Sequence, residues 1–323
     1  MALSYEFSIG SVRAKEKSLL TSQDIEQLLA CKSTKELCAM LSDKGYGDGG
    51  SVDEIIENHT ERTWAYLKSV APDFGIFAPF IMLNDAHNFK VVLKGIMADR
   101  EYAHLLTKPC NVAHETLIKA VEHRRMNLLP DFMAKPCETA YDLLAHTSDA
   151  RTCDAVIDRA VMEEMLRQAE QFDSPFLKAY FNTTVFYNNI KIAIRSSRTG
   201  ADRDYLEKAL CEVDGFRKNA VTDAALKGSD YLIDELAKYS EYDCKTAIEH
   251  YKKSPSAFER FVDDKLILMA KESCKRASEG AEPLLGYYLG CEAEKKVIHI
   301  IESGIRTGTD AEIIRERLRE IYG

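Results

Sequence analysis

Glycine and proline are scarce in this sequence, in which 323 residues include only 16 glycines and 8 prolines. Average usage is about 7% for glycine and about 5% for proline. These residues terminate helices and supply the turns of all-β folds, whereas the alanine, leucine, glutamate, lysine and arginine that fill long segments here favour helix. The composition therefore predicts a mostly or wholly α-helical fold, and a chain of this length is expected to form more than one domain.

Long hydrophobic runs are also missing. The longest apolar segment, GIFAPFIML at 75–83, is interrupted by Pro79, and a bilayer crossing needs about 20 apolar residues. The N-terminal segment lacks the basic and then apolar layout of a signal peptide. We therefore expect a soluble, cytoplasmic protein.

An excess of positive charge is absent, because the net charge is −9. Binding to phosphate backbones needs a basic surface, and the short basic segment EHRRMNLL at 122–129 does not supply one, so nucleic acid is not an expected partner. The nine cysteines are odd in number and include no CxxC pair. Neither a disulfide framework nor a zinc site is predicted.

Catalytic motifs are missing as well. The sequence has no GxxxxGK[ST], no HExxH and no GxSxG, which excludes the common signatures of nucleotide, zinc-protease and hydrolase chemistry. A di-metal helical bundle needs two Glu-x-x-His motifs, and only Glu101 to His104 matches. No catalytic residue, cofactor, metal or small-molecule substrate is therefore predicted.

What the sequence does contain is one pattern repeated three times. Three lysines, each in a predicted amphipathic helix, lie 101 and 105 residues apart, and the residue 33 positions before each lysine is acidic and follows a β-branched residue. The lysines are Lys90, Lys191 and Lys296, and the acids are Glu57, Asp158 and Asp263. An identical offset in three places indicates an internal repeat.

Each copy predicts the same succession of helices. A first helix begins near the acid, at 52–70, 154–172 and 256–277, and a proline-containing break leads to a second helix that carries the lysine. In the first copy Phe89, Val92, Leu93 and Ile96 form one apolar face. The repeat predicts three similar helical domains of about 100 residues, at 1–103, 104–210 and 211–323.

The repeated charges suggest contacts between consecutive helices. Asp158 is expected either to pair with Lys191 or Arg195, or to lie on a solvated face. Capping boxes at Ser33 with Glu36 and at Thr309 with Glu312 predict two further helix starts.

Four segments carry a resemblance to a known family: GSVRAKEKSLLTSQDIEQLL at 10–29, VIDRAVMEEML at 156–166, YFNTTVFYNNIKIAIRSSRTG at 180–200 and EPLLGYYLGCEAEKKVIHIIESGIRTG at 282–308. The chain resembles the C subunit of the V-type and A-type rotary ATPases, whose eukaryotic homologue is the d subunit of the V-ATPase. The phrase 189–191 and the EPLLGYYL segment followed by Glu292 and Glu294 are the most specific parts. Two positions depart from the family pattern: no aspartate precedes Asn189 in TTVFYNN, and His299 stands where an arginine is common.

The resemblance implies a non-catalytic funnel of three helical domains about a pseudo-three-fold axis. Such a protein sits on the cytoplasmic face of the membrane proteolipid ring, receives the central-stalk subunits of D and F type, and transmits torque for ATP-coupled proton or sodium transport. The repeated polar residues are then expected either to hold the walls together or to approach the cavity. These residues are Glu57, Asn88, Lys90, Asp158, Asn189, Lys191, Arg195, Asp263, Glu294 and Lys296.

Two other classes of protein remain open at this point. A stand-alone helical-repeat scaffold that binds proteins is the first, although repeats of about 100 residues exceed the roughly 34–47 of ordinary helical solenoids. A helical-bundle enzyme is the second, and it requires a metal or a carboxylate constellation that the sequence does not display.

Overall fold

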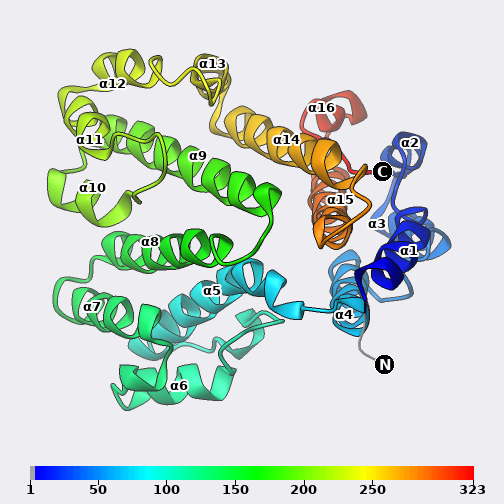
Figure 1. The fold of residues 1–323 in the computed structure, drawn as a ribbon, viewed down its shortest axis with the longest axis horizontal. Coiled ribbons are helices and arrows are strands. Elements are labelled where there is room, and N and C mark those ends of the chain that lie inside the picture. The colour runs from blue at the N-terminus through cyan, green and yellow to red at the C-terminus, as the bar shows by residue number, and fades with distance from the viewer. Residues whose placement is uncertain (1–3) are drawn as a thin grey trace. The chain divides into compact units, whose positions relative to one another are not determined.

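The computed structural model describes residues 4–323, and every regular element in this range is a helix (Figure 1). The prediction of an all-α fold is confirmed. The first three residues of the predicted domain 1–103 lie outside the described part. None of the described helices, including the 25-residue α9 and α15, combines the length and apolarity that a membrane crossing requires.

The chain forms two compact units. One consists of the segment ending at Gly75 together with Thr246–Gly323, and the other is Ile76–Lys245. The first unit contains α1 Tyr5–Glu16, α2 Ser22–Leu29, α3 Thr34–Asp43, α4 Val52–Val70, α14 Pro255–Cys274, α15 Glu282–Arg306 and α16 Ala311–Arg315. The second contains α5 Ala78–Met97, α6 His114–Glu122, α7 Asp131–Thr147, α8 Ala150–Ala169, α9 Pro175–Thr199, α10 Arg203–Ala209, α11 Lys218–Lys227 and α12 Ser229–Leu236. Helix α13, Cys244–Lys253, includes the junction, and the division into three domains stays a prediction.

The helix pairs expected from the repeat are present. Helices α4, α8 and α14 carry the acids, and α5, α9 and α15 carry the lysines. Each lysine helix has a proline at its first or second position, namely Pro79, Pro175 and Pro283. Proline is tolerated there because the first N–H groups of a helix have no intrahelical acceptor, so the proline of each break sets the start of the helix.

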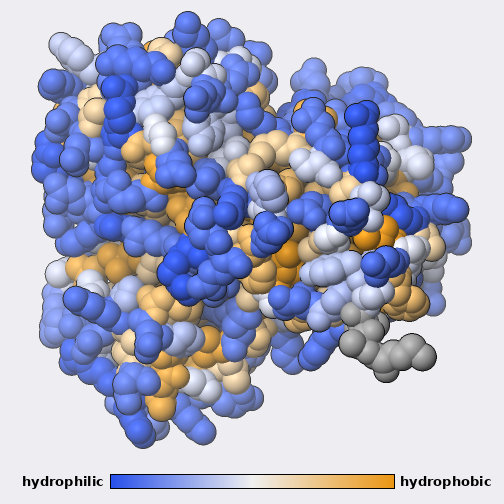
Figure 2. All heavy atoms as spheres, viewed as in Figure 1, coloured by the Kyte–Doolittle hydropathy of each residue, from blue (hydrophilic) through white to orange (hydrophobic). Residues whose placement is uncertain are grey.

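The cores of the two units differ in composition. Aliphatic side chains of α2, α3, α4, α15 and α16 form a continuous cluster in the first unit. The core of the second unit also contains packed aromatic rings, and Phe186 stacks on Tyr242 with ring centroids 3.6 Å apart. Polar residues cover most of the face shown in Figure 2. Burial of these clusters accounts for most of the stability of helices that are too short to persist alone.

The predicted helix cap at Ser33 is confirmed, and the predicted cap at Thr309 is wrong. Ser33 caps α3 by accepting a hydrogen bond from the backbone N–H of Glu36, as expected. At the C-terminal end the cap of α16 is Asp310, whose carboxylate accepts from the N–H of Glu312. The Thr309 hydroxyl is instead within 2.8 Å of the Thr307 hydroxyl. The carboxylate one residue later takes the capping position, and the helix extends only to Arg315.

Gly286 gives the first test of this packing. A Cβ at this position in α15 would lie 2.3 Å from the Tyr322 hydroxyl oxygen and 2.6 Å from the Cys274 Cβ. Tyr322 is fully buried, so it has no free space to retreat into. Gly286→Ala is expected to lower the free energy of unfolding, measured by urea denaturation, by about 1–3 kcal/mol.

Gly10 is the matched control. It lies in α1, is exposed, and would place its Cβ in open space. Gly10→Ala is expected to raise stability by up to about 1 kcal/mol, because alanine has the higher helix propensity. Equal effects of the two substitutions would contradict the close contact at Gly286.

Candidate functional site

The residue two positions before each repeated lysine is polar and buried in all three copies. Asn88 in α5 and Asn189 in α9 are fully buried, and Glu294 in α15 is 1% exposed. Buried polar groups are costly unless they are hydrogen-bonded. Each of the three residues meets this condition by forming hydrogen bonds to the main chain of another segment of the same unit.

The two asparagines bind the main chain in the same way. The Asn189 Nδ2 donates to the carbonyl of Cys211 at 2.9 Å, and its Oδ1 accepts from the N–H of Cys211 at 3.0 Å. The Asn88 Nδ2 donates to the carbonyl of Thr107 at 2.9 Å, and its Oδ1 accepts from the N–H of Thr107 at 2.8 Å. A side-chain amide thus satisfies both backbone groups of one residue, and it fastens a later segment of the chain to the helix.

Glu294 occupies the equivalent position in the third copy and binds the beginning of the chain. Its Oε1 accepts from the N–H of Leu20 at 2.5 Å, and its Oε2 accepts from the Tyr46 hydroxyl. Burial raises the pKa of Glu294 to about 7, and the two hydrogen bonds only partly oppose this rise. In the third copy, the partners of the buried polar residue are therefore Tyr46 and Leu20, which lie 248 and 274 positions earlier in the chain.

Two of the repeated lysines form ion pairs with repeated acids. The Lys90 Nζ lies 2.5 Å from Asp158 Oδ1 and links α5 to α8. The Lys296 Nζ lies 2.6 Å from Asp263 Oδ1 and links α15 to α14, and Arg319 reaches the other oxygen of Asp263 at 3.1 Å. These side chains are partly exposed, so each pair contributes at most about 1 kcal/mol.

The expected pairing of Asp158 with Lys191 or Arg195 is wrong. Asp158 binds the lysine of the preceding copy, because α5 packs against α8 and brings Lys90 to it. Lys191 and Arg195 lie on an exposed side of α9, and Glu57 is exposed on α4. The 33-residue spacing therefore gives an ion pair within the third copy but not within the second.

Two contacts were not anticipated from the sequence. Asp85 is 1% exposed and accepts the backbone N–H groups of Asn111 at 2.9 Å and Val112 at 3.0 Å. Arg13 donates to the carbonyls of Cys274 at 2.8 Å and Ala277 at 2.7 Å, at the C-terminal end of α14. A cation is favourable at that end of a helix. The available signals in the sequence were an acid within an apolar helix and the arginine of the segment 10–29.

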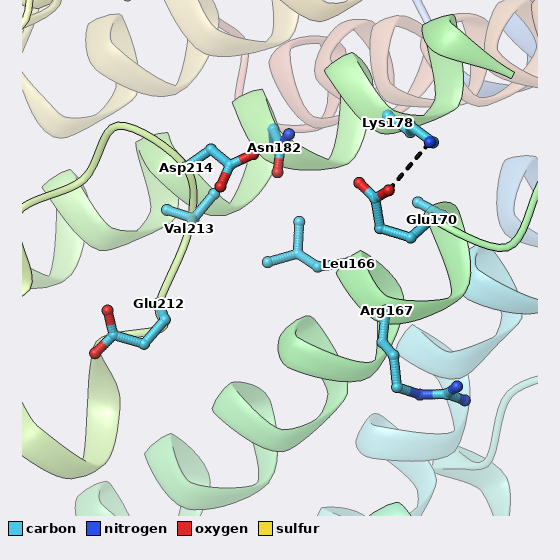
Figure 3. A pocket seen from close by; sticks show the side chains of 9 residues that line it. Leu166, Arg167, Glu170, Lys178, Asn182, Glu212, Val213 and Asp214 are labelled. Carbon is cyan, nitrogen blue, oxygen red and sulfur yellow. Dashed lines mark ion pairs between the residues drawn. The ribbon is translucent and has the colours of Figure 1, made fainter.

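A cavity of about 380 Å³ in the second unit has a lining rich in charged and polar side chains (Figure 3). The lining includes Lys178, which pairs with Glu170 at 3.0 Å. Figure 3 shows Leu166 between this pair and the side of the pocket that carries Glu212 and Asp214. The described lining has no histidine, cysteine or serine.

Among residues 4–323, no three histidine, cysteine or acidic side chains gather as a metal site would require. All nine cysteines are free thiols. The polar groups that the repeat brings together bind helices and main chain to one another. The fold and these contacts define a class of protein, an all-helical protein in which buried polar side chains such as Asn88, Asn189 and Glu294 bind main chain.

Comparison with known proteins identifies the family. The family model described as ATP synthase (C/AC39) subunit matches residues 8–317, and the chain belongs to this family. The C subunit of the V-type sodium ATPase of Enterococcus hirae is 22% identical over 319 residues, covering 96% of this chain and 97% of that protein. The C subunit of the A-type ATP synthase of Halorubrum lacusprofundi is 23% identical over 344 residues, covering 97% of each chain. The C subunit of the A-type ATP synthase of Methanothermobacter thermautotrophicus is 22% identical over 342 residues, covering 95% of this chain and 86% of that protein.

Proposed function

We propose that this protein is a non-catalytic central-stalk subunit of a V-type or A-type rotary ATPase. It acts as a socket that connects the rotor shaft to the membrane proteolipid ring and transmits torque for ATP-coupled proton or sodium transport. The family match over residues 8–317 carries the proposal. In this role the protein is cytoplasmic and peripheral to the membrane through the ring, with its three repeats arranged as a funnel about a pseudo-three-fold axis.

The repeated buried contacts support a mechanical role. A protein that transmits torque must resist local opening, and local opening is governed by the stability of individual segments. Asn88 and Asn189 each fasten a separate main-chain segment to a long helix through two hydrogen bonds. Glu294 binds the main chain at Leu20 through one hydrogen bond and the Tyr46 hydroxyl through another. Such contacts stiffen the body without any reaction chemistry.

The partners follow from the same proposal. The central-stalk subunits of D and F type occupy the socket, and the proteolipid ring contacts the opposite end. The polar segments 196–204 and 302–310, at the ends of α9 and α15, are candidate contact loops. One relative is named as a subunit of a sodium ATPase and another as a subunit of an ATP synthase. The proposal therefore covers transport of protons or of sodium, and both synthesis and hydrolysis of ATP.

A binding experiment with purified central-stalk subunits tests the proposal. We expect co-elution as a one-to-one complex on a sizing column, with a dissociation constant measured by titration calorimetry. Arg195→Glu reverses an exposed charge on α9 and is expected to weaken the complex by about tenfold, as loss of one favourable charge contact at an interface does.

Lys68→Glu is the matched control, because Lys68 is exposed on α4 and lies outside the repeated lysine helices. It is expected to leave the dissociation constant unchanged. Failure to bind the folded stalk subunits, both alone and with the assembled ring, would favour a stand-alone helical-repeat scaffold for other proteins.

A further inference from the structure

A second cavity, of about 190 Å³, lies within the first unit and is lined by cations. Lys15 at the end of α1, Lys44 after α3 and Arg62 in α4 surround it, together with His59 and a floor that includes Tyr66. We call these five residues the basic pocket. The described lining contains no aspartate and no glutamate.

The positive charge of the basic pocket is only partly compensated. Lys44 pairs with Asp24 beside the cavity, and this contact holds the pKa of Asp24 at about 2. The Lys15 Nζ lies 5.4 Å from the centre of the Tyr66 ring. Neither Lys15 nor Arg62 forms an ion pair with any residue in the described range 4–323. About two positive charges therefore face the cavity without a counter-charge.

The guanidinium of Arg62 is held in place by main-chain acceptors. Its Nη2 donates to the carbonyl of Tyr46, and its Nε donates to the carbonyl of Asn58 at 3.3 Å. These neutral acceptors orient the charge but do not cancel it. An oriented guanidinium at a cavity wall is a common element of oxyanion recognition.

His59 lines the cavity together with the three cations. Its ring stacks on Tyr46, with centroids 4.2 Å apart. Burial, and next the positive charges of Arg62 and Lys15, lower the pKa of His59 to about 4. The imidazole is therefore neutral at neutral pH, and a proton is disfavoured there. The part of this shift that comes from Arg62 and Lys15 reflects positive charge near the cavity, and positive charge favours an anion.

We propose that the basic pocket binds a phosphate group, either as inorganic phosphate or as the phosphate of a small ester. Arginine and lysine are the side chains that recognise phosphate oxygens in proteins. Ser18 and Thr63 also line the cavity, and its volume accommodates a phosphate with few further atoms. A bound phosphate joins α1, the segment after α3, and α4, which are three separate parts of the first unit.

Titration calorimetry of the full chain with inorganic phosphate, at constant ionic strength maintained with chloride, tests the proposal. We expect saturable one-to-one binding. Lys15→Gln combined with Arg62→Gln is expected to weaken it by about tenfold or more, because the two substitutions remove both unpaired positive charges that would bind the phosphate oxygens. Glycerol 3-phosphate is the second probe: tighter binding than inorganic phosphate identifies an ester as the ligand, and equal or weaker binding identifies the free ion.

The matched control is Lys35→Gln combined with Lys68→Gln, which removes two exposed charges of the same unit outside the pocket. Lys15→Gln alone serves as a variant that leaves the fold intact, because Lys15 is exposed. A histidine NMR titration gives an independent readout: phosphate is expected to raise the pKa of His59. Absence of saturable phosphate binding, equal weakening by the control pair, or an unchanged His59 titration would each overturn the proposal.

Discussion

Replacing Asn189 by alanine is expected to lower the free energy of unfolding by about 2–4 kcal/mol. The substitution removes the partner of both the N–H and the carbonyl of Cys211, and Cys211 is fully buried. Two backbone groups are then left unsatisfied away from water, and each costs about 1–3 kcal/mol. Urea denaturation, followed by the far-ultraviolet circular dichroism of the helices, measures the change.

Asn188 provides the control one position away on the same helix. Its side chain is half-buried, and its amide contacts only the Met162 sulfur at 3.2 Å among the contacts described for it. Asn188→Ala is expected to change stability by less than about 1 kcal/mol. Asn189→Asp has no donor for the Cys211 carbonyl and buries a carboxylate beside it, so a loss at least as large as that of Asn189→Ala is expected at neutral pH. Similar losses for Asn188→Ala and Asn189→Ala would show that the bonds to Cys211 are not responsible.

The helices themselves were predictable from the sequence because their signals are local. The segment 52–70 was expected as a helix, and α4 is Val52–Val70. Proline at the start and an amphipathic pattern after it fix the beginning and the buried face of α5, α9 and α15 without reference to distant residues. Thr309 shows the limit of such signals, because two capping residues stand next to each other and only the packing decides between them.

The partners of the repeated polar residues were not predictable, because they depend on which helices pack together. Asp158 is 33 residues before Lys191 but binds Lys90, which is 68 residues away. The partner of Asn189 lies 22 residues later in the chain. One signal was available: a polar residue stands two positions before each lysine, inside an otherwise apolar helix face. A polar residue there predicts a buried hydrogen bond but does not say to what.

In the third copy the buried polar residue binds an earlier part of the chain, whereas in the first two copies it binds a later part. Asn88 and Asn189 bind residues that follow them, at positions 107 and 211. Glu294 instead binds the segment at Leu20, far earlier in the sequence. Its carboxylate accepts the Leu20 N–H and the Tyr46 hydroxyl, whereas an amide also donates. This makes the third contact sensitive to protonation, unlike the first two.

Replacing Glu294 by glutamine is expected to raise stability above pH 7 by about 2–3 kcal/mol. Burial raises the pKa of Glu294 from 4.5 to about 7, so the folded protein binds this proton more tightly than the unfolded chain does. The contribution of the protonated carboxyl is complete below pH 4.5 and is lost as the pH rises through about 7. Glutamine is neutral at every pH, retains an acceptor for the Leu20 N–H, and does not undergo this loss.

The difference between Glu294→Gln and the unmodified protein, measured by urea denaturation from about pH 4 to about pH 8, isolates this effect from the other titrating groups. His59 has its pKa lowered to about 4, mainly by burial, and stabilises the fold increasingly as the pH rises through the same range. Asp24, with a pKa of about 2, stays ionised throughout and keeps its pair with Lys44. Both contributions are common to the two proteins and cancel in the difference. A flat difference for Glu294→Gln would mean that Glu294 titrates alike in the folded and unfolded states.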